Sequence, residues 1–368
     1  QKPAYEIYQC DWSSNVCSSD LYAQEAGLYV EIFESSDRCG GRVAHDVVDG
    51  LVIDHGFQVI NFNYPELKKL LKKDVASKPI FSRFTFASGA TGRTLSAFNP
   101  LSWLVNLSVI TKIYSNFITG VFLMDPRQVS KEVSRRIVKY FVKGRPHLVD
   151  GGVGTIIPTL LDGIPSSQIH LNTRVTEVVK AEAGLIIRTD NSNLPADTFD
   201  YVVIATNGGV GSIRGTSGGN SRHWNASATV YHSTRKDLSQ FNQLILGENF
   251  TNSLVISNAN PTYSSDSRSL IATTYLGSID ETGWKKVGIE KTAEIASLYG
   301  LKPEDLDLVS VQNIPYSLPS FSTSEPRSLS IVDSNDSRIV YAGDAFDEPS
   351  QNGALRSGRA AVEKLLSH

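Results

Sequence analysis

The chain has 368 residues, with 35 Lys and Arg against 38 Asp and Glu, which gives a formal net charge of −3. This balance excludes the strong positive charge by which proteins attract nucleic acids, so no nucleic-acid partner is expected. Hydrophobic residues make up 40% and charged residues 20%, as in globular proteins with one composite domain or two domains. Three cysteines without a CxxC pair predict neither a disulfide framework nor a zinc site, so a reducing cytoplasm is the expected location.

The most apolar segment is residues 101–124, and polar side chains interrupt it at Asn106, Lys112, Ser115 and Asn116. It is therefore a poor transmembrane candidate and predicts a buried amphipathic helix pair. Two other interpretations stay open: an apolar wall of a substrate cavity, or a patch that touches a membrane surface. No apolar signal-peptide core is visible at the start of the chain.

In the first third of the chain, residues 28–34 (LYVEIFE) predict a buried strand of a parallel sheet. Gly27 before it is expected to end a helix. The turn SSDRCGGR follows, and VVDGLVIDHGFQVI predicts two short strands around Asp49-Gly50. NYPELKKLLKKD predicts a helix capped by Asn63, with Pro65 in its first turn.

Further along, residues 76–100 predict a loop and hairpin, and residues 101–143 predict helices. Residues 169–205 alternate like a meander of strands and end in a fully apolar run at 201–205. The C-terminus predicts a strand, RIVYAGDAF, a loop, DEPSQN, and a helix, GALRSGRAAVEKLLS. Apolar strands at both ends of the chain favour a sheet assembled from distant segments.

Two motifs carry chemistry. Glu34 ends the first strand, where an acidic residue of a dinucleotide fold binds the adenosine ribose, and Gly40, Gly41 and Arg42 could meet phosphate. A solvated Glu and an ordinary glycine turn are the alternatives.

The second motif lies near the C-terminus. Asp344 comes at the carboxyl end of a buried strand, and Gly353-Ala354 opens a helix capped by Asn352 or Ser350. The N–H groups of such a helix suit an anion or the electron-rich edge of a reduced flavin.

Four segments together resemble the FAD-dependent amine oxidase and phytoene desaturase superfamily: ESSDRCGGRV, IDHGFQVI, DGGVGTIIPTLL with IHLNTRVTEVV, and AGDAFDEPSQNGALRSGRAA. Within it, the chain is most similar to bacterial NAD(P)/FAD-dependent oxidoreductases of the phytoene-dehydrogenase-like type. The resemblance extends from Tyr22 to His368.

The resemblance implies FAD as cofactor and assigns a part of the cofactor site to each matching residue. The ribose would lie at Glu34, the diphosphate and ribityl chain at Gly40, Gly41, Arg42, Gly343 and Asp344, the adenine at Val175, and the flavin ring beside Gly56, Phe57, Gln58, Asn352, Gly353 and Ala354.

The implied fold class is α/β, with a discontinuous Rossmann-like FAD-binding domain and an α+β substrate domain that contains an antiparallel sheet. The FAD-binding domain is expected to comprise residues 22–62, 149–210 and 331–368. The substrate domain is expected to comprise residues 63–148, which are mainly helical, and 211–330.

Residues 1–21 resemble a translated sequencing-library adapter, with single-base differences at Pro3 and Asn15. The family's first strand and its G-x-G-x-x-G loop belong at this place, and the segment contains no glycine. We therefore expect 1–21 to be a non-native segment. We also expect the chain as written to fold poorly and bind FAD weakly, because the diphosphate would lose N–H donors.

For function, the favoured hypothesis is an FAD-dependent desaturase or dehydrogenase that takes hydride from an apolar small molecule. An FAD amine oxidase using oxygen is the alternative, and a flavin-fold fragment without turnover is the third. His55 and Tyr316 are candidate substrate residues, although a lone His and a packed Tyr are more often structural. No catalytic residue and no metal ligand is predicted, and peripheral contact with a membrane stays open.

Overall fold

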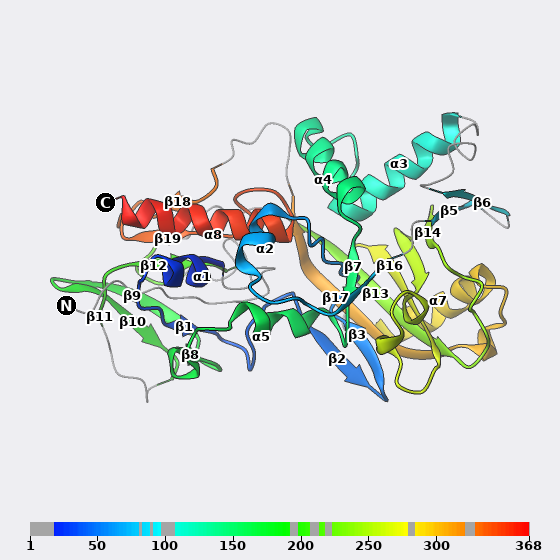
Figure 1. Cartoon of the computed structure of the whole chain (residues 1–368), viewed down its shortest axis with the longest axis horizontal. Helices are drawn as coiled ribbons and strands as arrows, with labels where there is room; N and C mark the ends of the chain where they lie inside the picture. Colours follow the sequence, from blue (N-terminus) through cyan, green and yellow to red (C-terminus); the bar gives the residue numbers. More distant parts are fainter. Residues whose placement is uncertain are drawn as a thin grey trace.

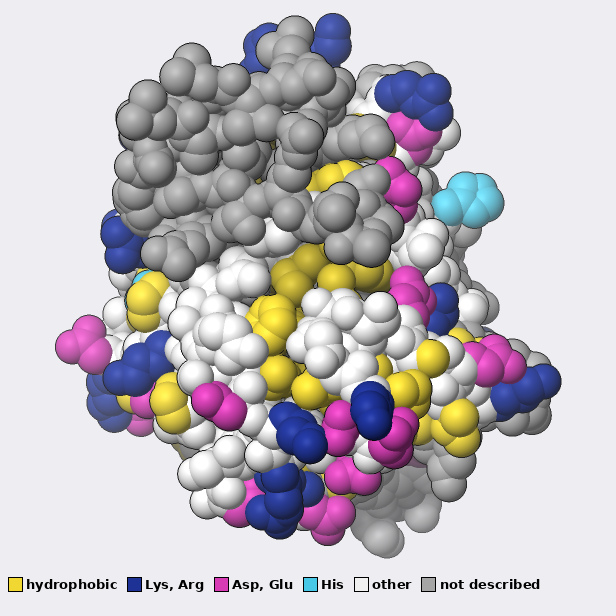
Figure 2. All heavy atoms as spheres, turned by 90° about the vertical axis from the view of Figure 1, so that its right-hand side faces the viewer, with side chains coloured by type: hydrophobic (Ala, Val, Ile, Leu, Met, Phe, Trp, Pro, Cys, Tyr) yellow, Lys and Arg dark blue, Asp and Glu magenta, His cyan; other side chains and the backbone are white. Residues whose placement is uncertain are grey.

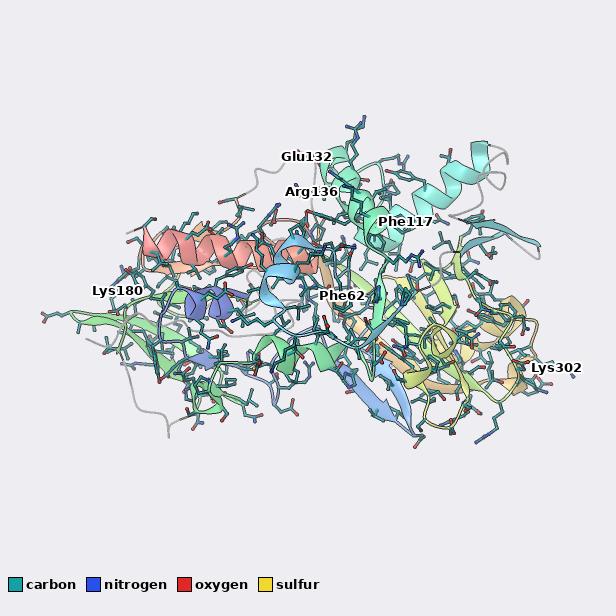
Figure 3. The ribbon with its side chains drawn as sticks, in the orientation of Figure 1. Phe62, Phe117, Glu132, Arg136, Lys180 and Lys302 are labelled. Carbon is teal, nitrogen blue, oxygen red and sulfur yellow. The ribbon has the colours of Figure 1, made fainter. Side chains whose placement is uncertain are left out.

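The structure is a computed structural model and describes residues 18–80, 83–88, 91–96, 107–191, 198–206, 213–217, 223–278, 284–320 and 328–367. The molecule is elongated, with two regions side by side and a helical arm above the junction between them (Figure 1). Lys180 and Lys302 mark its opposite ends (Figure 3). Of residues 1–21, the first 17 lie outside the described residues, and the other four begin the first helix.

The first region contains parallel strand pairs between distant segments. β1 (Ile32–Phe33) pairs with β8 (Ile169–His170), and β12 (Val202–Ile204) pairs with β19 (Ile339–Tyr341). β18 (Ile331–Val332) lies antiparallel to β19 on its other side. The predicted apolar strands at 201–205 and 338–346 are confirmed as buried strands, because consecutive parallel strands between covering layers bury both faces.

Helices cover these strands. α1 (Ser18–Glu25) packs along α8 (Gln351–Leu366), and the Ser18 hydroxyl donates to the carbonyl oxygen of Ala354 over 3.2 Å. Gly27 ends α1 at φ +78°, and the N–H of Leu28 returns to the Ala23 carbonyl, as predicted for a glycine-terminated helix. One apolar core joins these elements with α5 (Ile156–Leu160).

A three-stranded antiparallel meander extends the first region at its outer end (Figure 1). It consists of β9 (Val175–Ala181), β10 (Gly184–Thr189) and β11 (Thr198–Phe199). Phe199 and Leu185 are fully buried and pack with Phe33 of β1 in a second core. The predicted meander at 169–205 is therefore confirmed for the described residues of 175–199, whereas β8 and β12 pair with β1 and β19 instead.

The second region is a seven-stranded sheet in the order β17-β13-β16-β15-β14-β5-β6. Its strands are β17 (Asp307–Pro319), β13 (Trp224–Thr234), β16 (Ser269–Leu276), β15 (Asn252–Val255), β14 (Leu244–Gly247), β5 (Arg83–Ser88) and β6 (Thr91–Ser96). All pairs are antiparallel except β14 with β5. The hairpin near residue 90 thus joins a sheet otherwise built from residues 224–319.

The two faces of this sheet have different neighbours. α7 (Trp284–Leu298) packs on one face, where Ile295 and Ala296 contact buried strand residues such as Val230 and Ile271. The opposite face carries Tyr231 and Leu254, which pack against Leu51 of β3. This second face turns toward the first region and forms one wall of the cavity described below.

The helical arm consists of α3 (Leu107–Phe122) and α4 (Lys131–Lys143), and it projects above the sheet (Figures 1 and 3). Ile118 and Phe122 pack against Val133 and Ile137 between the two helices. The prediction that residues 101–143 are helical is confirmed at α3 and α4. The described part of 101–124 forms one helix and not the expected pair, and residues 101–106 lie outside the described residues. No helix among the described residues is both long and apolar enough to cross a membrane.

Short elements connect the regions: β2 (His45–Val48), β3 (Leu51–Asp54), α2 (Pro65–Leu70), β4 (Ser77–Pro79), β7 (His147–Val149) and α6 (Ile256–Ala259). The two predicted strands around Asp49-Gly50 are the hairpin β2–β3. The prediction that Asn63 caps the following helix was wrong. The cap position is Tyr64, which makes no side-chain capping bond. The side-chain amide oxygen of Asn63 accepts from the Lys68 ammonium group instead.

Candidate active site

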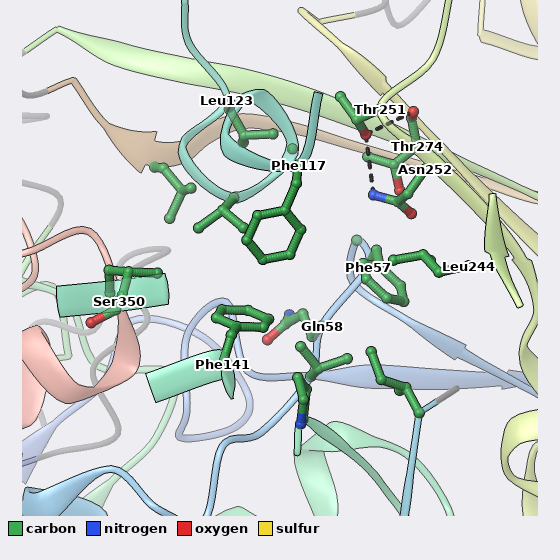
Figure 4. A pocket seen from close by; sticks show the side chains of 18 of the residues that line it. Phe57, Gln58, Phe117, Leu123, Phe141, Leu244, Thr251, Asn252, Thr274 and Ser350 are labelled. Atoms are coloured by element: carbon green, nitrogen blue, oxygen red, sulfur yellow. Dashed lines mark hydrogen bonds between the residues drawn. The ribbon is translucent and has the colours of Figure 1, made fainter. Parts of the chain in front are cut away.

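A cavity of about 1320 Å³ lies where the sheet, the helical arm and the loop after β3 meet. Its volume exceeds the roughly 300–1,000 Å³ usual for pockets that hold one drug-sized ligand. Figure 2 shows hydrophobic side chains gathered in the middle of one face of the molecule, with charges of both signs around them. The apolar wall is formed by Phe57, Ile80, Phe117, Val121, Leu123, Ile137, Val138, Phe141, Leu244, Leu246 and Ile314 (Figure 4).

The loop after β3 supplies His55, Gly56, Phe57 and Gln58 to the cavity wall. Gly56 adopts φ +84°, which favours glycine, and Tyr231 fixes the turn by donating to the Gly56 and Asp54 carbonyls. The Gln58 amide donates to the carbonyl oxygens of Arg42 and His55. The structure therefore brings these four sequence-predicted residues together.

Asp54 directly precedes this loop, on the side away from the cavity. It was not identified as a site residue from the sequence. Its side chain is fully buried and accepts from the Tyr263 hydroxyl over 2.6 Å and from the Val153 N–H over 2.8 Å. Burial raises the pKa of Asp54 to about 7, although both hydrogen bonds lower it. Asp54 is therefore a buried titratable group directly beside the cavity loop.

A buried ion pair joins the two ends of the chain. Arg42 lies in the cavity wall, and its guanidinium contacts the Asp344 carboxylate over 2.7 Å, with both side chains at most 5% exposed. The same guanidinium donates to the Ser317 carbonyl and lies 5.2 Å from the centre of the Trp224 ring. The glycine turn at 40–42 and the AGD strand end, predicted separately, thus form one site.

The glycines of this turn have a packing role of their own. Gly40 and Gly41 adopt φ +107° and +52°, and a Cβ on Gly40 would lie 2.8 Å from the Ile157 side chain of α5. The turn therefore lies against α5 and carries Arg42 to the ion pair.

Glu34 and Val175 lie near each other, away from the cavity wall. Glu34 is buried at the end of β1, where its carboxylate accepts from the Ser36 N–H over 2.7 Å. Its carbonyl oxygen accepts from the Thr173 N–H, two residues before Val175. The strand end and the segment leading into the meander are therefore joined, as the resemblance implies.

The N-terminus of α8 reaches the cavity through Ser350 and Gln351. Ser350 is the cap, because its hydroxyl oxygen accepts from the Gly353 N–H over 3.1 Å, and the helix begins at Gln351. A Cβ on Gly353 would lie 2.1 Å from the Glu348 carbonyl, so packing alone requires glycine there. Gly353 and Ala354 are buried behind the wall.

Asn352 faces the protein interior. Its amide bonds to the Glu66 N–H and the Glu348 carboxylate. Gly343 precedes the ion-pair residue at φ +145° and donates to the Ser357 hydroxyl of α8.

These residues fit a flavin by the chemistry of their donor set. The cavity end near α8 offers a guanidinium, amide groups and a helix N-terminus, and the Gln351 Oε1 is buried there without a partner among the described residues. A ring system with carbonyl acceptors and an N–H donor would satisfy such a set.

His55 and Tyr316, the candidate substrate residues, differ in position. His55 lines the cavity, and its Nε2 lies 2.9 Å from the Asp46 carboxylate. Tyr316 packs edge-on against Trp224 with ring centres 6.3 Å apart, and it is not among the residues that line the cavity. Ile314, Ser317 and Leu318 of the same strand line the cavity instead. The pairing of β17 with β13 is irregular over this stretch, so regular alternation does not decide which of these side chains face the cavity.

Sequence reasoning missed a polar corner formed by Thr251, Asn252 and Thr274 on the sheet side of the cavity (Figure 4). No sequence motif predicts this corner, because the residues come together through the pairing of β15 with β16. Among the cavity-lining residues that the structure describes, none is Asp or Glu, whereas Arg42, Lys143 and Arg145 are present. In the described ranges, no group of three potential metal ligands occurs.

Comparisons with known proteins agree with this geometry. The family described as flavin containing amine oxidoreductase matches residues 16–108 and 80–366. Among solved structures, an oxidoreductase from Methanosarcina mazei is similar at 14% identity and a TM-score of 0.76, covering 98% of this chain and 99% of that one. Cyclohexylamine oxidase from Brevibacterium oxydans IH-35A is similar at 13% identity and 0.67, covering 100% and 99%.

A reduced UDP-galactopyranose mutase is similar at 13% identity and a TM-score of 0.72, covering 100% of this chain and 94% of that one. Curated protein sequences gave no match. Fold and site together define an FAD-dependent oxidoreductase of α/β architecture. The chain belongs to the flavin containing amine oxidoreductase family, as the sequence resemblance predicted.

Proposed function

We propose that this FAD-dependent enzyme dehydrogenates an uncharged, apolar substrate in the cavity beside the loop 55–58. The observation that carries the proposal is the composition of the wall, which is largely aliphatic and aromatic and has no acidic side chain among its described residues. An ammonium group would lose its hydration there without gaining a counter-charge, whereas apolar surface gains free energy on burial. Bound FAD would accept hydride from the substrate.

The chain's own residues bind, orient and exclude water. Arg42, Asp344 and Gln58, with the N-terminus of α8, would hold the cofactor, and Glu34 with the segment at Val175 would hold its ribose and adenine. Phe57, Phe117 and Phe141 point into the cavity and would orient the substrate against the cofactor (Figure 4). This apolar wall excludes water from the reacting bond.

The second candidate is oxidation of an amine with oxygen as acceptor. It is favoured by the family to which the chain belongs and by the three Phe rings, whose faces can attract a cation. The proposal ranks it second because Lys143 and Arg145 on the same wall would repel an ammonium group, whereas the charge of Arg42 is already balanced by Asp344.

We further propose that the FAD-binding domain is discontinuous, over 22–62, 149–210 and 331–368, with the substrate domain at 63–148 and 211–330. The parallel pairs β1–β8 and β12–β19 and the joining of β5 to β14 support these boundaries. We also propose a cytoplasmic location. The helical arm would contact a membrane surface peripherally, near the half-exposed Tyr114.

The test mixes the chain and saturating FAD with a candidate substrate in the absence of oxygen. Reduction of the flavin is measured as the loss of its visible absorbance. Polyene and other apolar candidates are compared with primary amines of matched length. Reduction by apolar compounds alone is the expected result. Reduction by amines alone would replace the proposal with the second candidate, and reduction by neither would favour a flavin-binding chain without turnover.

A further inference from the structure

On its sheet side the cavity has a polar corner, formed by Thr251, Asn252 and Thr274, next to the apolar part of the wall (Figure 4). Asn252 begins β15 and pairs with Thr274 of β16, so their side chains share the cavity face of the sheet. All three residues are at least nine-tenths buried, at 3%, 6% and 4% exposure. The corner is therefore shielded from bulk water.

The hydrogen bonds among the three corner residues leave one acceptor atom without a donor among the described residues. The Thr251 hydroxyl donates to the Thr274 carbonyl over 3.0 Å, so its oxygen accepts from the Asn252 Nδ2 over 3.2 Å. The Thr274 hydroxyl pairs with that of Thr229 over 3.0 Å. The Asn252 Oδ1 is buried and has no hydrogen-bond partner in the part of the chain that the structure describes.

An unsatisfied carbonyl of this kind is unfavourable, since buried polar groups of folded proteins are nearly always hydrogen-bonded. A ligand that brings a donor to the corner removes the penalty, and a ligand without a donor keeps it. The described lining residues include no acidic side chain to balance a charged donor, so an uncharged donor fits best. A hydroxyl group on an apolar skeleton meets both demands.

We infer that Asn252 is a specificity-determining residue, and that its Oδ1 accepts a hydrogen bond from a hydroxyl group of an otherwise apolar substrate. The inference rests on the proposed function, because it assigns the substrate class to the same cavity. Thr251 acts as a positioning residue, since its hydroxyl accepts from the Asn252 Nδ2 and so fixes the orientation of the amide. The substrate class is thus an apolar alcohol.

The test is equilibrium binding of three small probes to the full chain in saturating FAD, by calorimetry. 1-Decanol carries an uncharged donor, decyl methyl ether carries only an acceptor, and decylammonium carries a charged donor. We expect decanol to bind roughly tenfold more tightly than the ether, which corresponds to about 1.4 kcal/mol. Decylammonium should bind more weakly than decanol.

Variants locate the preference. Asn252→Leu should bind the alcohol and the ether equally, and Asn252→Ala serves the same purpose if the leucine variant does not fold. Asn258→Leu is the matched control, because the Asn258 amide donates to the Leu238 and Phe241 carbonyls and Asn258 is not among the described residues that line the cavity. This control should keep the tenfold preference.

The outcomes separate this inference from the proposed function. Equal binding of decanol and ether by the wild-type chain would overturn the role of Asn252 and leave an apolar cavity. Preference for the ether or for decylammonium would overturn it as well. Failure of all three probes to bind, together with no flavin reduction by apolar compounds, would overturn the proposed function itself.

Discussion

At the scale of residues, the site depends on buried polar groups with defined partners. Asp54 receives hydrogen bonds from Tyr263 and Val153 and lies directly before the loop 55–58. Tyr231 connects the same loop to the seven-stranded sheet. These contacts determine where His55 and Gln58 meet the cavity, so a change at Asp54 should be felt both in stability and in the cavity wall.

Asp54 predicts a specific dependence of stability on pH. Burial raises its pKa from 3.8 to about 7, so the unfolded chain ionises Asp54 near pH 4 while the folded chain keeps it protonated. The stabilisation by Asp54 is complete below pH 4 and is lost as the pH rises to 7, by as much as about 4 kcal/mol. Asp54→Asn cannot titrate, so it should gain stability relative to wild type over this range.

The measurement is urea unfolding of both proteins at pH 4 to 8. The difference between their unfolding free energies should change between pH 4 and 7 and level off above that. Parallel curves over the whole range would show that Asp54 is already ionised in the folded chain.

At the scale of elements, the close approach of α1 to α8 decides how the first region is covered. Gly358 lies in the middle of α8, and a Cβ there would meet the Ser18 side chain at 2.1 Å and the Ser19 backbone at 2.8 Å. A glycine inside a helix is normally unfavourable, but in this chain a larger side chain at 358 would collide with α1. By contrast, a Cβ on Gly120 of α3 would make an ordinary 3.6 Å contact with Thr251.

These two helical glycines should respond to alanine with opposite signs. Gly358→Ala should destabilise the chain by roughly 1–3 kcal/mol, because the added methyl group pushes α1 away from α8. Gly120→Ala should stabilise it by roughly 0.5–1 kcal/mol through helix propensity. Urea unfolding measures both. A stabilised Gly358→Ala would mean that α1 does not pack on α8 as described.

At the scale of the whole molecule, the Arg42–Asp344 pair connects segments 302 residues apart in the sequence. Both side chains are buried, so removing one leaves the other desolvated without its ionic partner, at a cost of roughly 3–5 kcal/mol. Replacing both with apolar residues of similar size avoids that cost. Stability and cofactor binding can therefore be separated at this pair.

Arg42→Met alone should lose both stability and FAD affinity, whereas Arg42→Met with Asp344→Leu should regain much of the stability and still bind FAD poorly. Unfolding in urea and quenching of FAD fluorescence give the two readouts. Recovery of FAD affinity in the double variant would show that the pair is structural and takes no part in holding the cofactor.

The sequence by itself determined what depends on local pattern. Continuous apolar runs specify buried strands, Gly27 specifies the end of α1, and the motifs at 40–42 and 343–354 specify the family through chemistry that needs those residues in that order. The helical character of residues 107–122 and 131–143 also followed from the sequence, although the described part of 101–124 is one helix and not the expected pair. The prediction that Asn63 caps α2 was wrong because the helix begins one residue later than expected, after Tyr64. The Asn63 side chain binds Lys68 instead.

Only the tertiary structure decided which distant residues meet. The ion pair between Arg42 and Asp344, the burial of Asp54 and the corner at Asn252 all arise where separate segments pack together. The sequence made Tyr316 a candidate beside the cavity, whereas in the structure it packs against Trp224, in a stretch where the pairing of β17 with β13 is irregular. Strand register and burial depend on how the whole chain packs. They therefore determine which side chains line the cavity, and the local sequence pattern does not.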